Sequence, residues 1–123
     1  MDFSQYSALA IRTASNHTLE TKEAQLICAA LGMAGEGGEV ADHIKKFIYH
    51  GHDLDTAKLV KEAGDVLWYI NLLACALGVP LEAIASQNIS KLAERYPDGL
   101  FTAERSRNRK EYQTEEVKEG DHL

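Results

Sequence analysis

The sequence predicts an all-α fold, a four-helix-type bundle that assembles as a homo-oligomer. Apolar residues recur at helical spacing along four segments, and no segment shows the strict alternation that is typical of a strand. Pro80 and Pro97 stand between these segments rather than inside them. The third segment is apolar on more than one face, and a helix that is apolar all round must be buried all round. One short chain does not easily achieve this, so we expect self-association.

Four helices are expected along the chain, at about residues 3–14, 21–48, 56–77 and 80–95. The polar residues 15–18 should break the chain after the first helix. In the loop 49–55, either Asp53 or Asp55 can cap the helix that follows. Gly78 should end the third helix, and Pro80 suits the first turn of the fourth.

Length and composition suit one domain in an ordinary soluble protein of 123 residues. We expect a single helical domain over residues 1–105 and a charged, mobile tail over residues 106–123. The net charge of −6 argues against binding to a nucleic-acid backbone. It does not exclude a small phosphate ligand, because bound divalent cations can invert the local charge.

Neither an apolar run long enough for a membrane span nor a signal peptide is evident in the sequence. We therefore expect a cytoplasmic protein with no membrane partner. Cys28 and Cys75 lie in apolar helical patterns and should be reduced, buried thiols.

Two pairs of acidic residues have the same spacing on consecutive long helices. Glu36 and Glu39 are three residues apart, and so are Glu62 and Asp65. A short loop joins the two helices, so they should pack antiparallel, with both pairs at a similar height above the loop. The spacing alone leaves two interpretations open: a metal site, or a solvated face on which Lys58 and Lys61 pair with the carboxylates.

Four converging carboxylates would repel one another unless they were protonated or bound to cations. All-oxygen ligation favours Mg²⁺, with Mn²⁺ as a substitute. The first acidic pair also lies among glycines at positions 35, 37 and 38, each costing a helix roughly 1 kcal/mol relative to alanine. We expect these glycines to bring the helix backbone close to a neighbour or a ligand.

Three ordered blocks, GEGGEVADHIKK, KEAGDVLWYI and NISKLAERYPDGLF, resemble the MazG-like all-α nucleoside triphosphate pyrophosphohydrolases. The ExxE and ExxD motifs of that family would be Glu36–Glu39 and Glu62–Asp65 here. The resemblance covers about residues 20–105. It implies an Mg²⁺-dependent enzyme that cleaves a nucleoside triphosphate to the monophosphate and pyrophosphate and that forms a homodimer or homotetramer.

The resemblance also implies roles for individual residues. Glu36, Glu39, Glu62 and Asp65 would bind the metal. Glu36 and Glu39 are expected to be catalytic. The resemblance leaves the general base open, because Gly35 and Gly37 flank Glu36 where some relatives carry a further acidic residue; we expect Glu39 to act on the attacking water. The third block would contact the nucleotide through Asn88. Lys91 and Arg95 lie on the same side of the fourth helix as Asn88, and they could bind phosphates or form a solvated basic edge.

Other candidate residues have competing interpretations. Tyr69 could stack on the substrate or belong to the core, whereas Trp68 is expected in the core. Lys46 could bind phosphate or pair with Asp42. Asn88 lies near an apolar stripe and, if buried, needs a partner.

Two further groups are expected to be solvated. His50 and His52 lack a third ligand for zinc. The basic residues of the tail, Arg105, Arg107, Arg109 and Lys110, could also reach the phosphate site of a neighbouring subunit.

The leading functional hypothesis is a nucleotide pyrophosphohydrolase that clears surplus or non-standard nucleotides. One alternative is a phosphoribosyl-nucleotide pyrophosphohydrolase. Another is a non-catalytic helical oligomer whose carboxylates bind cations structurally. The few pocket contacts that would determine base and sugar preference have no recognisable spacing in the sequence.

Overall fold

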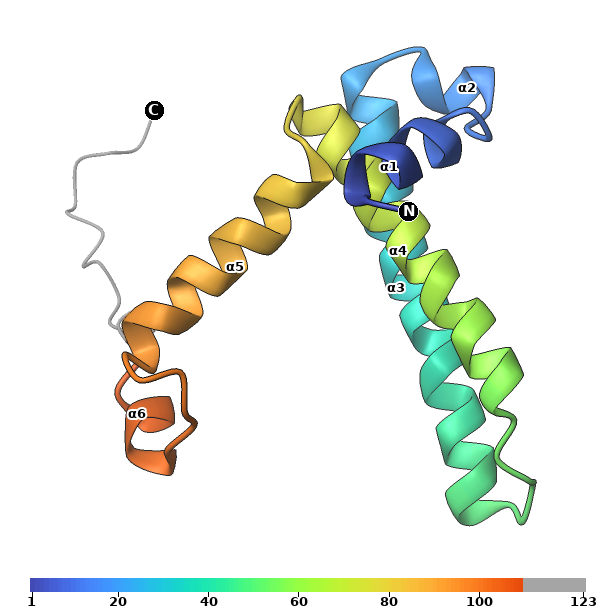
Figure 1. The fold of residues 1–123 in the computed structure, drawn as a ribbon. Coiled ribbons are helices and arrows are strands. Elements are labelled where there is room, and N and C mark those ends of the chain that lie inside the picture. The colour runs from blue at the N-terminus through green and yellow to red at the C-terminus, as the bar shows by residue number, and fades with distance from the viewer. Residues whose placement is uncertain (110–123) are drawn as a thin grey trace, which may run out of the picture. The chain divides into compact units, whose positions relative to one another are not determined.

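The computed structural model describes residues 1–109, which are helical throughout apart from their connections (Figure 1). They fall into two compact units, Met1–Ile84 and a second unit that begins at Ala85, and each is described by itself. The helices are α1 (Phe3–Ile11), α2 (Asn16–Leu19), α3 (Lys22–Tyr49), α4 (Thr56–Leu77), α5 (Leu81–Arg95) and α6 (Ala103–Arg107).

The two long helices begin and end at the residues that their caps dictate. Thr21 precedes α3 and accepts a hydrogen bond from Ala24 N at 3.0 Å, and Asp55 does the same for α4 from Lys58 N at 3.0 Å. Asp55, rather than Asp53, is therefore the cap. Gly78 ends α4 in the left-handed region at φ 68°, where a side chain would be strained.

The N-terminal prediction was wrong in two details. The first helix ends at Ile11, because Thr13 turns back and donates its hydroxyl to Ala10 O at 2.7 Å. The polar residues that follow are not a plain break. Ser15 accepts a hydrogen bond from Thr18 N at 3.2 Å and so caps the single-turn helix α2.

The C-terminal prediction missed α6, which crosses the boundary expected after residue 105. Thr102 caps this helix by accepting a hydrogen bond from Arg105 N at 3.2 Å. The remainder of the predicted tail, residues 110–123, lies outside the described residues.

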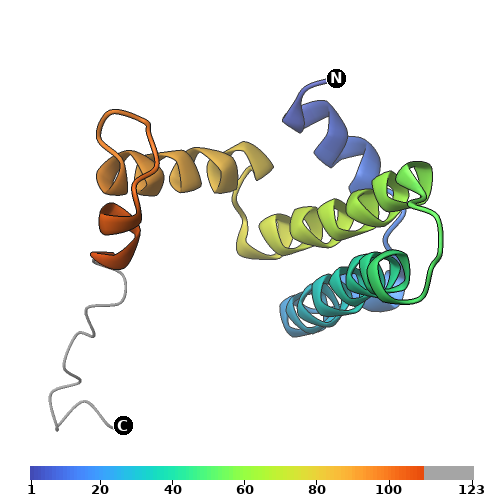
Figure 2. The same ribbon diagram turned by 90° about the horizontal axis from the view of Figure 1, so that it is seen from below.

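In the first unit, α3 and α4 form the antiparallel hairpin that the sequence predicts, and they lie side by side in both views (Figures 1 and 2). α1 packs against α4, and α2 packs against α3. Ala29, Leu72 and Ala74 are fully buried where these helices meet. Within residues 1–109, no single helix is both long and apolar enough to cross a membrane; α4 and α5 meet that test only when taken together as a bent pair.

Trp68 joins α1 to α4. Its indole Nε1 donates to Ala10 O at 3.1 Å and to Thr13 Oγ1 at 2.8 Å, so it is part of the structural framework, as expected. We predict that Trp68→Phe lowers the free energy of unfolding by about 1 kcal/mol, because the ring packing is largely kept and the hydrogen bonds are lost. Urea titration checks this. Tyr49→Phe, at an exposed position, is the control and should change stability by less than about 0.5 kcal/mol.

Candidate metal centre

The four acidic residues converge between α3 and α4. Oxygen atoms of Glu36, Glu62 and Asp65 lie within 4.8 Å of one another. Ligand atoms of Glu39, His43 and Glu62 form a second group that meets the same limit. The hairpin therefore brings the two predicted pairs together, and Glu62 belongs to both groups. That these side chains bind a metal remains a prediction.

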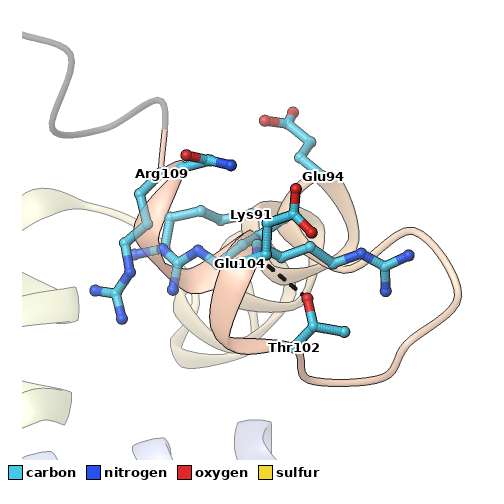
Figure 3. A pocket seen from close by; sticks show the side chains of 8 residues that line it. Lys91, Glu94, Thr102, Glu104 and Arg109 are labelled. Atoms are coloured by element: carbon cyan, nitrogen blue, oxygen red, sulfur yellow. Dashed lines mark hydrogen bonds between the residues drawn. The ribbon is translucent and has the colours of Figure 1, made fainter.

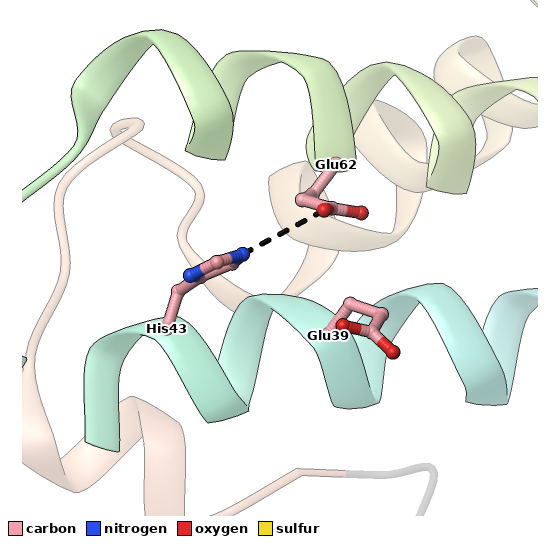
Figure 4. Close-up of side chains that lie close together, drawn as sticks. All are labelled: Glu39, His43 and Glu62. Atoms are coloured by element: carbon pink, nitrogen blue, oxygen red, sulfur yellow. Dashed lines mark ion pairs between the residues drawn. The ribbon is translucent and has the colours of Figure 1, made fainter. Parts of the chain in front are cut away.

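His43 is a member of this cluster that the sequence prediction did not include. Its Nε2 lies 3.6 Å from Glu62 Oε1, and both side chains are largely buried, at 18% and 16% exposure. Figure 4 shows His43 reaching from α3 towards Glu62 on α4. Among the described residues, the buried Nε2 atom has no hydrogen-bond partner. It therefore presents a nitrogen next to the carboxylate shared by both groups.

The electrostatics of the cluster fit a cation. Burial raises the pKa of Glu36, and the charges of Asp65, Glu62 and Glu39 raise it further, together with a hydrogen bond to Glu62. The cluster thus accepts positive charge, either as a proton or as a metal ion. The negative charge of the cluster also acts on Tyr6 of α1. Burial raises the pKa of its hydroxyl, and the charge of Asp65 raises it further.

The carboxylate oxygens of the cluster are donors that suit a hard divalent cation, and the imidazole of His43 is a softer donor at the edge of the cluster. Carboxylate oxygens suit Mg²⁺ and Mn²⁺, and the imidazole of His43 suits Mn²⁺ better than Mg²⁺. The alternative of a solvated face paired with lysines receives little support. Among residues 1–109, the ion pair that Glu62 forms is with His43, and neither Lys58 nor Lys61 pairs with Glu62 or Asp65.

The expected close approach of Gly35, Gly37 and Gly38 to a ligand or to another subunit stays a prediction, and within the described chain the close approach involves a different glycine. Nothing in the described chain lies within 4 Å of a Cβ built at Gly35, Gly37 or Gly38. The close approach occurs one turn earlier, at Gly32, where a Cβ would overlap the ring of Tyr69. Gly32 therefore allows the α4 aromatic ring to rest on the α3 backbone.

Tyr69 packs on neighbouring residues, as a core residue does, and it also lines a cavity; that it stacks on the substrate stays a prediction. Its ring packs on Gly32 and meets Trp68 edge-on, with centroids 5.0 Å apart and planes at 81°. It also lines a cavity of about 680 Å³ that includes Glu36 of the acidic cluster and Ile27 on α3. A half-buried aromatic ring thus forms one wall of a cavity that reaches the carboxylates.

Lys46 pairs with Asp42, the alternative considered for it. The Nζ–Oδ2 distance is 2.7 Å, and Lys45 contacts the other oxygen of Asp42 at 2.9 Å. Hydrogen bonds from the two lysines hold the pKa of Asp42 well below its usual range. The charge of Glu39 adds slightly to the raised pKa of Lys46, so the ammonium also responds to the acidic cluster.

The predicted nucleotide contacts of the third block lie on α5, in the second unit. Asn88 is exposed in the single chain, so it does not need a partner within it. Lys91 and Arg95 line a cavity of that unit (Figure 3), and the Arg95 guanidinium lies 5.8 Å from the centre of the Tyr96 ring. His50 and His52 are exposed, as expected of loop residues.

Comparison with known proteins agrees with this geometry. The MazG nucleotide pyrophosphohydrolase domain family matches residues 26–100, more than half of the chain. The gene 37 protein of Mycobacterium phage L5 is 35% identical over 75 residues, a match that covers 58% of this chain and 66% of that protein. No solved structure matches the chain. The chain therefore belongs to the MazG nucleotide pyrophosphohydrolase domain family.

Proposed function

We propose that this protein is a nucleoside triphosphate pyrophosphohydrolase that requires Mg²⁺, or Mn²⁺ in its place, and releases pyrophosphate and a nucleoside monophosphate. The observation that supports this most directly is the convergence of Glu36, Glu39, Glu62 and Asp65 in a chain of this family. The neighbouring carboxylates raise the pKa of Glu36, which shows that negative charge accumulates in the cluster. Such a cluster favours divalent cations and disfavours a phosphate that arrives without a cation.

The residues of the cluster would have different roles in cation binding and in proton transfer. Glu62 and Asp65 on α4 and Glu36 on α3 would hold the cation, which would supply charge neutralisation at the phosphate oxygens and lower the pKa of water. Glu39 is exposed at the edge of the cluster and takes the proton of the attacking water as general base. The imidazole of His43, 3.6 Å from Glu62 Oε1, would be a further ligand at the edge of the site.

Residues of each unit are candidates for contacts with the substrate. The cavity walled by Tyr69 receives the nucleoside, because it is partly apolar and adjoins Glu36. Lys91 and Arg95 bind phosphate oxygens, and Asn88 contributes a polar contact to the nucleotide. Lys46 is a weaker contact, since its ammonium already pairs with Asp42.

We also propose that the protein forms a homodimer or homotetramer. Several large apolar side chains of the hairpin remain more than half exposed in the single chain, including Leu31 at 69%, Val60 at 66% and Ile27 at 60%. Exposed apolar area of this kind, along the two helices that carry the cluster, marks an interface. Sedimentation equilibrium would measure the association.

Product analysis tests the proposed activity. With Mg²⁺ and a panel of canonical and modified nucleoside triphosphates, we expect release of pyrophosphate without orthophosphate, and no release in EDTA. Glu39→Gln should lower turnover by about 10²-fold or more, because it removes the base. Glu23→Gln, the same change at an exposed position of the first turn of α3, should leave turnover unchanged.

The outcomes separate the three hypotheses. Release from phosphoribosyl nucleotides alone would favour the phosphoribosyl-nucleotide alternative. Cation binding without any release from any nucleotide would contradict catalysis, and a cation-dependent rise in melting temperature would then identify a structural metal site.

A further inference from the structure

The two groups of ligand atoms between α3 and α4 differ in chemistry. The first group offers carboxylate oxygens alone, from Glu36, Glu62 and Asp65. The second group adds a nitrogen, because its members are Glu39, His43 and Glu62. Oxygen donors suit Mg²⁺, whereas an imidazole nitrogen suits Zn²⁺ and other transition metals. The two groups therefore favour different ions.

The distance between His43 and Glu62 fits two ligands of one ion better than it fits a hydrogen bond. Nε2 of His43 lies 3.6 Å from Oε1 of Glu62 (Figure 4), beyond the range of about 2.7–3.2 Å for N–H···O hydrogen bonds. Two donors that bind one tetrahedral zinc ion at about 2.0–2.2 Å lie roughly 3.4 Å apart. Within residues 1–109, the buried Nε2 atom makes no hydrogen bond, and a cation bound next to it would satisfy it.

The two groups also open on different cavities. Glu36 lines the cavity that Tyr69 walls, whereas His43 lines another cavity, of about 560 Å³, at the loop end of the hairpin. His52 lines this second cavity as well, and the charges of its lysines and aspartates balance: Lys46 and Lys58 against Asp53 and Asp55. An ion can therefore reach His43 from the loop end without passing through the cavity proposed for the nucleoside.

We infer that Glu39, His43 and Glu62 form a second cation position that takes a transition-metal ion such as Zn²⁺, and that its occupation inhibits hydrolysis. Three protein ligands, with a further position left to water, are typical of zinc held by histidine and carboxylate groups. The inhibition rests on the proposed function. A Glu39 carboxylate that binds Zn²⁺ no longer accepts the proton of the attacking water, and Glu62 belongs to the Mg²⁺ ligands as well.

Titration with Zn²⁺ in excess Mg²⁺ tests the binding, because Mg²⁺ then occupies the group made of carboxylates alone. Calorimetry on the full chain should detect Zn²⁺ binding under these conditions. His43→Asn should weaken it by about 10-fold or more, since one ligand is lost. His50→Asn is the matched control, because His50 is exposed in the loop and does not line the cavity; it should change the affinity by less than about 2-fold.

The NMR signals of the imidazole rings locate the ion without any substitution. When Zn²⁺ is added to the wild type in excess Mg²⁺, the ring signals of His43 should shift at lower Zn²⁺ concentrations than those of His50. This measurement decides the position of the ion even if His43→Asn disturbs the fold, which melting curves would reveal.

Turnover measured at buffered free Zn²⁺ tests the inhibition. Zn²⁺ should lower the release of pyrophosphate by the wild type in excess Mg²⁺. Relative to its own turnover without Zn²⁺, His43→Asn should need a Zn²⁺ concentration about 10-fold or more higher for half-inhibition.

Four results would each overturn the inference: no Zn²⁺ binding in excess Mg²⁺, equal weakening by His43→Asn and His50→Asn, unshifted His43 signals, or Zn²⁺ bound at His43 with undiminished turnover. Turnover with Mg²⁺ alone tests the proposed function separately. If no nucleotide is hydrolysed but Zn²⁺ shifts the His43 signals, the activity is contradicted and the second cation position is supported.

Discussion

Glu62→Gln should lower turnover more than any other single change at the acidic cluster, by about 10²-fold or more. Glu62 is the one carboxylate that belongs to both groups of ligand atoms, and its side chain is only 16% exposed. The amide keeps the shape but removes the charge that a cation needs. Turnover at saturating nucleoside triphosphate, measured as pyrophosphate release over a range of Mg²⁺ concentrations, checks this result.

The same variant should not lose stability in the absence of metal. Glu62 contributes to the raised pKa of Glu36 by its charge and by a hydrogen bond, so an uncharged residue at position 62 relieves repulsion between the helices. If the cluster binds a cation as proposed, binding should stabilise the wild type by about 2.7 kcal/mol at one hundred times the dissociation constant, and Glu62→Gln should lose most of that gain. Differential scanning calorimetry with and without Mg²⁺ measures both effects.

Glu23→Gln serves as the control, since it makes the same chemical change on α3 away from the cluster. Wild-type turnover by Glu62→Gln would contradict the assigned role of this carboxylate. A fall in stability without metal would instead indicate that the pair of Glu62 with His43 is chiefly structural.

The convergence of the carboxylates was predictable because it depends on local features that the sequence carries. Asp55 and Gly78 delimit α4, and the short loop forces α3 and α4 to run antiparallel. Two i, i+3 pairs at similar distances from that loop then lie at a similar height of the hairpin. The positions of the helix ends therefore predict that the four carboxylates lie at the same level of the hairpin.

The sequence only partly indicates His43. It follows Glu39 by four residues and so shares its face of α3. Its proximity to Glu62 depends on the rotation of α3 about its own axis, which packing against α4 determines. Spacing along one helix does not contain that information.

The second unit was less predictable for a related reason. A run of arginines is typical of a solvated surface, and the sequence places Arg105 and Arg109 far along the chain from Lys91. The turn at Gly99 and the hydrogen bond from Arg105 to Asp98 bring them to one cavity. Such contacts depend on the exact path of a few loop residues, which hydrophobic periodicity does not report.

The last prediction concerns Gly32, the glycine at which close packing was found. Gly32→Ala should lower the free energy of unfolding by about 1–3 kcal/mol, because the added Cβ overlaps the Tyr69 ring and the two long helices have to move apart. Gly37→Ala, five residues later in α3, should raise it by up to about 1 kcal/mol, since alanine favours the helix and nothing in the described chain lies near its Cβ. Urea titration of both variants measures the difference.

A double substitution identifies the cause. If the Tyr69 ring is responsible for the loss, then in a Tyr69→Ala background Gly32→Ala should become neutral or stabilising, a coupling of about 1–3 kcal/mol between the two sites. Because Tyr69 also walls the cavity beside Glu36, Gly32→Ala should raise the KM for the nucleotide as the ring shifts. Equal and favourable effects of alanine at positions 32 and 37 would show that the ring yields without cost, and the close approach would then have no role in holding α3 against α4.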